Sequence, residues 1–207
     1  MIAIIDYGMG NLFSLSSSLK SLGYEVEITA DPERLRAADK LFLPGVGAFR
    51  DAQERLFSTG LADVIRGLAA EGKPLMGICL GMQLLFDKSY EYGEYEGLGL
   101  IPGTVVPMEG SIAPELKIPQ IGWNALHFTG LEHPAFADTK EGEFVYFVHS
   151  YYATDCDPYV VATTEYSKEL TAAVAKDNVC GCQFHPEKSG DVGLKILRAF
   201  CEWEGTA

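Results

Sequence analysis

The chain has 207 residues, 47% of them hydrophobic, and a formal net charge of −13 at pH 7. This length and apolar content favour one well-buried domain spanning residues 1–207. The acidic balance argues against nucleic acid and anionic membranes as partners, because both repel a negatively charged surface. Five cysteines, scattered between residues 79 and 201, are an odd number and do not form a disulfide framework, which favours a reducing cytoplasm.

The first residues of the sequence are apolar. Residues 1–6 are too few for a secretory signal peptide and lack its basic first part, so we expect them to begin a strand. No apolar run reaches the roughly 18 residues of a membrane span. The sequence therefore predicts neither a leader nor a membrane helix.

Up to residue 80 the sequence alternates between apolar strands and amphipathic helices. Strands are expected at 2–5, 24–28, 41–43 and in the run ending at Cys79, and helices at 12–22, 31–38, 49–56 and 61–68. Alternation of this kind implies right-handed crossovers and a parallel sheet covered by helices on both faces. Functional loops should then gather at the carboxyl ends of the strands.

The second half changes to short strand-like pieces joined by Gly, Pro and Asp turns, at 103–107, 112–126, 143–154, 159–164, 170–176 and 178–184. These pieces predict a mostly antiparallel extension of the same sheet. One last helix is expected around residues 194–201, and the acidic run 90–96 is expected to be a solvated loop. The predicted fold class is α/β, with a mixed sheet made of a parallel N-terminal core and an antiparallel C-terminal extension.

The stretch Gly77-Ile-Cys79-Leu-Gly81 marks the change from an apolar strand to helical spacing. It predicts a sharp strand-to-helix turn with Cys79 at the apex. Glycines suit both flanks, because the apex has a strained backbone and a Cβ at 77 or 81 would crowd the neighbouring chain. A thiol at a helix N-terminus ionises more easily, and the thiolate is the nucleophile. The alternative is a buried small hydrophobe, the usual state of a free cysteine.

A thiolate nucleophile needs a base, and the base needs an acceptor that orients it. After His185 a proline keeps the chain extended, which places Glu187 on the same side as the imidazole. His149 is a rival base, but it has no carboxylate at that spacing. His127 and His133 lie in polar surroundings and are expected at the surface. Without a nucleophile nearby, His185-Pro-Glu would equally well be an ion pair in a loop.

Acyl transfer also needs N–H donors for the developing oxyanion. The backbone N–H of Leu80, directly after Cys79, is placed for this role by the turn itself. A second donor is expected from the loop Pro44-Gly-Val46-Gly47, where glycines around Val46 let the peptide plane rotate at little steric cost. Such a donor could be switched in and out, although a glycine-rich loop of this kind is otherwise a simple turn.

Metal chemistry has no signal in the sequence. Cys180-Gly-Cys182 lacks the spacing of a metal site and is expected to be ordinary strand packing. Neither a ligand cluster nor a nucleotide fingerprint occurs, so no metal or organic cofactor is indicated.

Several blocks resemble a known family. Gly77-Ile-Cys79-Leu-Gly81-Met-Gln83 together with His185-Pro-Glu187 resembles the class I, triad-type glutamine amidotransferases. Within them, the glutaminase subunits of imidazole glycerol phosphate synthases are similar to this chain at 6–12, 43–49, 122–124 and 184–189. The resemblance runs from residue 2 to residue 190, and it implies the flavodoxin-like fold of that family.

The resemblance also implies a reaction. Cys79 would attack the side-chain amide of glutamine, form a glutamyl thioester and release ammonia, while His185 moves the protons and Glu187 holds the imidazolium. The positions that match family contacts to glutamine or its carboxylate are Gly47, Gln83, Ser150 and Tyr151.

A partner is implied in the same way. Ammonia would pass unprotonated to a (β/α)₈-barrel cyclase subunit in a heterodimer. That subunit joins it to a phosphorylated ribulosyl precursor in histidine biosynthesis, giving imidazole glycerol phosphate and an aminoimidazole carboxamide ribotide. The positions that match partner-facing ones are Asn11, Trp123, Tyr146 and Lys188, and aromatic residues are common interface anchors.

Two positions depart from the family pattern. Gln120 stands where a histidine after proline is expected, and Phe13 stands where a polar or basic residue is common. Both departures put in doubt the interface or coupling roles assigned to those side chains.

Two other classes of function remain as alternatives. A stand-alone cysteine hydrolase of γ-glutamyl or peptide bonds shares the turn and the triad, and it would hydrolyse steadily without a partner. A catalytically inactive binding module is disfavoured, because Cys79, His185 and Glu187 are all present.

Overall fold

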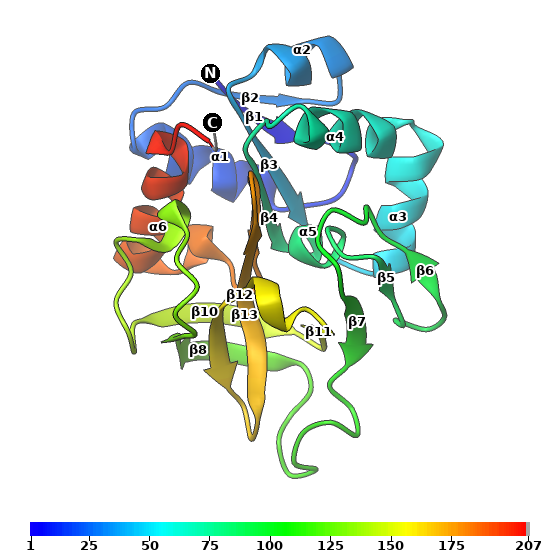
Figure 1. Ribbon diagram of the computed structural model, residues 1–207, viewed down its shortest axis with the longest axis vertical. Helices are drawn as coiled ribbons and strands as arrows, with labels where there is room; N and C mark the ends of the chain where they lie inside the picture. The colour runs from blue at the N-terminus through cyan, green and yellow to red at the C-terminus, as the bar shows by residue number, and fades with distance from the viewer. Residues whose placement is uncertain (206–207) are drawn as a thin grey trace.

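A computed structural model describes residues 1–205, and its centre is one large mixed sheet (Figure 1). The strands of this sheet are β1 (Ile2–Ile5), β2 (Val26–Thr29), β3 (Lys40–Gly45), β4 (Leu75–Cys79), β9 (His127–Phe128), β12 (Val160–Glu165), β13 (Glu169–Lys176) and β14 (Val179–Cys182). They lie in the order β2-β1-β3-β4-β14-β13-β12-β9. The strands from β2 to β14 in this order are parallel, and β13, β12 and β9 continue as antiparallel pairs. The predicted mixed sheet is confirmed.

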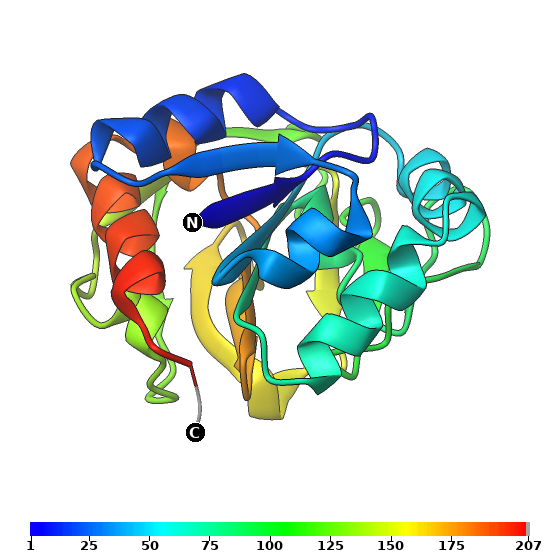
Figure 2. The same cartoon turned by 90° about the horizontal axis from the view of Figure 1, so that it is seen from above.

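Helices cover both faces of the sheet (Figure 2). One face carries α1 (Leu12–Ser21) and α6 (Gly190–Glu202), and the other carries α2 (Pro32–Ala37), α3 (Phe49–Ser58) and α4 (Leu61–Ala70). The short helix α5 (Leu80–Gln83) follows β4, and single 3₁₀ turns span Pro134–Phe136, Asp157–Tyr159 and Pro186–Lys188. Among residues 1–205, no helix has both the length and the apolar character needed to cross a membrane.

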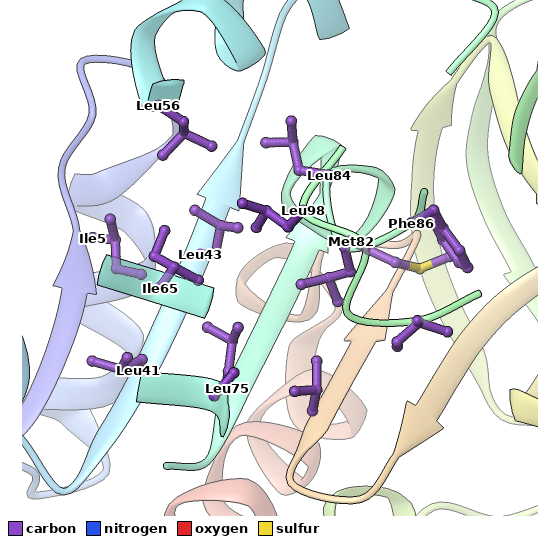
Figure 3. Packing of buried hydrophobic residues seen from close by; sticks show 14 of the residues in the cluster. Ile5, Leu41, Leu43, Leu56, Ile65, Leu75, Met82, Leu84, Phe86 and Leu98 are labelled. Atoms are coloured by element: carbon purple, nitrogen blue, oxygen red, sulfur yellow. The ribbon is translucent and has the colours of Figure 1, made fainter. Parts of the chain in front are cut away.

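The strand-to-helix turn after β4 is fixed to the apolar core. Helix α4 buries Leu61, Ile65 and Leu68 against β3 and β4, as its helical spacing predicts. Figure 3 shows this cluster, in which Met82 and Leu84 beyond the turn join the side chains of the two strands. Core contacts on both sides of the turn therefore hold it in one position.

The second half differs from the prediction of one continuous extension. Strand β8 (Gln120–Ala125) pairs only with β10 (Phe144–His149), and a third sheet of order β11-β7-β5-β6 contains the strands β5 (Lys88–Ser89), β6 (Tyr95–Glu96), β7 (Thr104–Pro107) and β11 (Tyr151–Thr154). The expected strand over 143–154 breaks at Ser150, where the chain passes from one sheet to another. The expected strand over 112–126 begins only at Gln120, because prolines at 114 and 119 lack the N–H that pairing needs.

The acidic run 90–96 is only partly a solvated loop. Glu91 is buried, and its carboxylate accepts the N–H of Phe49, the first residue of α3, at 2.8 Å. A carboxylate at a helix N-terminus satisfies a free donor and interacts favourably with the helix dipole. The prediction was wrong for Glu91, whose partner is 42 residues away in sequence.

His133 is buried instead of exposed, whereas His127 is at the surface as expected. The His133 ring accepts the N–H of Ala135 at 3.2 Å and packs edge-on against Trp203. Burial lowers the pKa of His133 to about 4, so the ring is neutral. The polar neighbours that suggested exposure in the sequence belong to the turn, and the ring itself points inward. Cys180 and Cys182 are buried in β14, which confirms ordinary strand packing.

Candidate active site

Cys79 lies at the sharp turn between β4 and α5. Its φ of +56° is in the region that side-chain-bearing residues rarely adopt. A Cβ on Gly81 would lie 1.7 Å from the carbonyl oxygen of Leu43, and one on Gly77 would lie 2.7 Å from the Gly81 oxygen. The predicted turn is confirmed, and both glycines are required because backbone atoms occupy the space of a side chain.

The Cys79 side chain is 8% exposed and has two polar neighbours. Gln183 donates an amide N–H to Sγ at 3.7 Å, and the Val148 carbonyl lies 3.9 Å from the sulfur. Gln183 is fully buried, and the sequence analysis did not predict it as a site residue. The available signal was a polar amide within an apolar stretch two residues before His185.

His185 reaches the same edge of the sheet because β14 runs parallel to β4. Its Nδ1 lies 2.8 Å from Glu187 Oε1, and these side chains are only 2% and 3% exposed. The backbone N–H of His185 donates to the carbonyl of Tyr146 in β10, which fixes the imidazole further. The predicted pairing of His185 with Glu187 is therefore present.

The ionisation of His185 reflects opposing effects. Burial lowers the pKa of His185, but the nearby Cys79 sulfur and the hydrogen bond and charge of Glu187 outweigh burial and raise it to about 9. The ring is therefore an imidazolium at neutral pH, with the sulfur on one side and the carboxylate on the other. Such a pair of partners suits a group that takes a proton from a thiol and later returns one to a leaving amine.

His149, the rival base, has both ring nitrogens engaged. Its Nδ1 lies 2.8 Å from the carbonyl oxygen of Tyr151, and its Nε2 lies 2.9 Å from the side-chain amide of Gln120. Burial lowers the pKa of His149 to about 4, so the ring is neutral. Neither nitrogen is free to accept a proton from Cys79, and the geometry favours His185.

A cavity of about 610 Å³ opens at this edge. It brings together most of the predicted site residues, which are Val46, Gly47, Cys79, Leu80, Gln83, Ser150, Tyr151, His185 and Lys188. Glu187 lies behind His185, outside the cavity wall. Within residues 1–205, no group of three or more His, Cys, Asp or Glu side chains is arranged to hold a metal ion.

Glu91 also lines the cavity and was missed as a site residue. Burial raises the pKa of this carboxyl group, while the N–H of Phe49 partly offsets the effect. It is placed to attract a positively charged group of a ligand. No sequence signal points to Glu91, because the residue stands in an acidic run that is expected to be a solvated loop.

The loop at the end of β3 is held firmly at one end and is open at the other. The Tyr7 hydroxyl donates to the carbonyl of Pro44 at 2.9 Å, and a Cβ on Gly45 would lie 2.7 Å from that hydroxyl. Val46 is partly exposed to the cavity, and Gly47 has a φ of +94°. The freedom to rotate is therefore concentrated at the Val46–Gly47 peptide.

The four predicted partner-facing residues lie mostly outside the cavity. Trp123 is 54% exposed on the outer face of β8, where it pairs in register with Tyr146 of β10 at 6.1 Å between ring centroids. Asn11 precedes α1 with its side chain free of any cap bond, and Lys188 is exposed at the cavity edge. Of the two positions that depart from the family pattern, Phe13 is exposed and Gln120 faces inward.

Comparisons with known proteins agree with this geometry. A sequence model of the family described as glutamine amidotransferase class-I matches residues 3–202. The chain is 51% identical to the imidazole glycerol phosphate synthase subunit HisH of Sulfurimonas denitrificans, covering 98% of each chain. It is 53% identical to the subunit of the same name from a Geobacillus species, covering 97% of this chain and 95% of that one.

Solved structures share the fold at lower identity. A crystal structure described as a glutamine amidotransferase superposes with a TM-score of 0.75 at 21% identity, covering 98% of both chains. A structure of PurLQS from Thermotoga maritima gives the same TM-score and identity, covering 97% of this chain and 96% of that one. On the full-length family match and the relatives that share half of its residues, the chain belongs to the class I glutamine amidotransferases, in the group of imidazole glycerol phosphate synthase subunits HisH.

Proposed function

We propose that this chain is the glutaminase subunit of an imidazole glycerol phosphate synthase, and that residues 1–207 work as one domain in the cytoplasm. It hydrolyses L-glutamine to glutamate and passes ammonia to a cyclase subunit for histidine biosynthesis. The observation that carries the proposal is the buried pair of Cys79 and His185 at the wall of one cavity, with Glu187 behind His185.

The chemistry follows from the three side chains. In the resting enzyme His185 already holds the proton of the Cys79 thiol, and the thiolate attacks the carbon of the glutamine side-chain amide. When the tetrahedral intermediate collapses, the C–N bond breaks and the imidazolium gives its proton to the leaving nitrogen, which departs as ammonia. Water, deprotonated by His185, then cleaves the thioester to glutamate and restores the pair of thiolate and imidazolium. Glu187 keeps the imidazole oriented and stabilises its charged form.

The oxyanion is stabilised by two backbone donors. The N–H of Leu80 is fixed by the turn, and the second N–H comes from the Val46–Gly47 peptide. Because freedom of rotation is concentrated at that peptide, it acts as the switch that the partner controls. Loss of one oxyanion donor costs on the order of 10²–10³ in rate, which is a large enough difference for a switch.

Glutamine binds as a zwitterion in the cavity. The backbone at Ser150 and Tyr151 holds its carboxylate, and Gln83 and Gly47 contact its body. The Glu91 carboxylate pairs with its ammonium group, since it is the buried acidic side chain in the cavity wall. An amino acid bound at both charged ends has its side-chain amide fixed relative to Cys79.

The partner is a (β/α)₈-barrel cyclase subunit that forms a heterodimer with this chain. The docking surface is the outer face of β8 and β10 with Asn11 and Lys188. It carries aromatic residues of the kind that anchor interfaces, the exposed Trp123 and the half-buried Tyr146.

The test is the rate of glutamine hydrolysis by the chain alone, with the purified cyclase subunit, and with the subunit plus its ribulosyl ligand. The proposal predicts slow hydrolysis alone and a rise of at least about a hundredfold in the full complex, as expected from gaining an oxyanion donor. Equal rates in all three mixtures would contradict the switch. Fast hydrolysis alone with no stable complex would favour a stand-alone hydrolase.

A further inference from the structure

A chain of buried hydrogen bonds leads from β8 to the nucleophile. His149 Nδ1 and Gln83 Nε2 both lie near the carbonyl oxygen of Tyr151, at 2.8 and 3.2 Å. Gln83 also donates to the amide oxygen of Gln183 at 3.0 Å, and Gln183 donates to Cys79 Sγ at 3.7 Å. At the other end His149 Nε2 meets Gln120 at 2.9 Å.

The direction of each bond is fixed by the Tyr151 carbonyl, which only accepts. His149 therefore carries its proton on Nδ1, and its neutral ring offers a lone pair on Nε2. The Gln120 Oε1 position lies 2.9 Å from Nε2, and because the oxygen and nitrogen of an amide are assigned from the hydrogen-bond network, the NH₂ group is the one that belongs there. The hydrogen bonds then run without a break from Gln120 to Sγ.

These groups are enclosed by the protein. Gln120 is 3% exposed, and His149, Gln83 and Gln183 are also buried. A buried amide that loses its hydrogen-bond partner is destabilising, so each member holds the next in place. The network is therefore sensitive to the loss of any one side chain.

The outer end of the network lies on the back of the docking surface. Residues of β8 alternate, so Gln120 faces inward beside His149 while Ile121 and Trp123 face outward. Gln120 and His149 form a cross-strand pair of β8 and β10. A shift of β8 against β10 at the outer face therefore moves the Gln120 amide relative to the His149 ring.

We propose that Gln120 and His149 are positioning residues, which connect the partner-facing strands to Cys79 through the Tyr151 carbonyl and the Gln83–Gln183 pair. The proposal rests on the proposed glutaminase function and adds a second route of control besides the Val46 peptide. It gives Gln120, which departs from the family pattern, a role inside the protein.

The first test measures Cys79 directly, without glutamine, as the rate of alkylation by iodoacetamide in the full complex. Gln120→Leu keeps a similar volume and removes the amide. We expect it to change the alkylation rate by about tenfold, because small displacements of reacting groups have effects of this size or larger. Asn124→Leu is the matched control, since it removes an amide of the same strand that bonds to the Glu165 carbonyl and the Ala125 N–H and not to the network.

The second test uses turnover and rescue. Gln120→Leu is expected to lower kcat for glutamine about tenfold, with ammonia-dependent synthesis and partner affinity unchanged. Gln120→His, which keeps an N–H donor for His149, is expected to restore most of the rate. Nitrogen chemical shifts of ¹⁵N-labelled histidine report whether the His149 ring stays neutral with its proton on Nδ1, and Gln120→Glu is expected to raise its pKa from about 4.

The outcomes separate the two proposals. Alkylation and kcat within twofold of wild type in Gln120→Leu, or an equal loss in Asn124→Leu, would overturn the positioning role. A His149 ring with its proton on Nε2 would also overturn it. If Gln120→Leu does not fold, Gln120→His and Gln120→Glu together with the wild-type spectrum decide the question. Absence of glutamine hydrolysis in the wild-type complex would overturn the glutaminase function, whereas alkylation and the spectra would still report on the network.

Discussion

Among single residues, His185 is the group whose charge the proposed reaction uses twice. Its pKa, raised to about 9, keeps the imidazolium through neutral pH and loses it as the pH rises through that value. Above this pH the ring no longer protonates the leaving nitrogen. We expect kcat for glutamine in the full complex to fall as the pH passes about 9.

Glu187→Gln tests the cause of the alkaline limb of this pH profile, the part in which kcat falls. It removes a carboxylate that raises the pKa of His185, so the falling limb moves to lower pH, and kcat drops by about 10²–10⁴. Glu141→Gln is the matched control, because Glu141 makes the same contact with His127 at the surface. A limb that stays in place in Glu187→Gln would show that another group titrates.

Glu91 tests how the substrate is held. Glu91→Gln keeps an acceptor for the N–H of Phe49 but removes the charge. We expect KM for glutamine to rise about 10–100-fold, the usual range for one charged hydrogen bond, with a smaller effect on kcat. Glutaric acid monoamide lacks the ammonium group, so the variant and the wild type should use it equally well. A variant that loses activity on both compounds would contradict the pairing.

Among the elements, the turn between β4 and α5 is the least tolerant of change. Gly81→Ala forces a methyl group against the Leu43 carbonyl and is expected to destabilise folding by more than about 3 kcal/mol, the upper end for overpacking. Gly67→Ala in α4 has open space and should stabilise by up to about 1 kcal/mol. Urea unfolding of both variants measures the difference, and equal stability would show that the turn is not constrained.

The elements also show what a sequence alone predicts. The parallel strands, their helices and the turn at Cys79 follow from local spacing and glycines, because those signals are carried by adjacent residues. Glu91 and Gln183 were missed because their roles depend on partners far along the chain, Phe49 and Cys79. The passage from β10 to β11 at Ser150 was missed for a similar reason, since neighbouring strands and not the residues themselves decide which sheet each joins.

For the whole molecule, the arrangement of the strands places the proposed docking surface next to the cavity, with Lys188 at the edge of both. Trp123→Ala is expected to weaken binding of the cyclase subunit by about 2 kcal/mol or more, as at interface hot spots, with folding unchanged. Ile28→Ala, an exposed apolar residue on the edge strand β2, is the control and should bind normally. Titration calorimetry compares the two, and equal affinity would place the interface elsewhere.

The most direct measurement is glutamine-dependent against ammonia-dependent synthesis in a complex that carries Cys79→Ala. Glutamine-dependent synthesis should fall by several orders of magnitude, as for the loss of other nucleophiles, while ammonia-dependent synthesis stays at the wild-type rate. Acid quenching of the wild-type reaction should also yield a glutamyl adduct on Cys79. Glutamine-dependent synthesis that survives in Cys79→Ala would contradict the account.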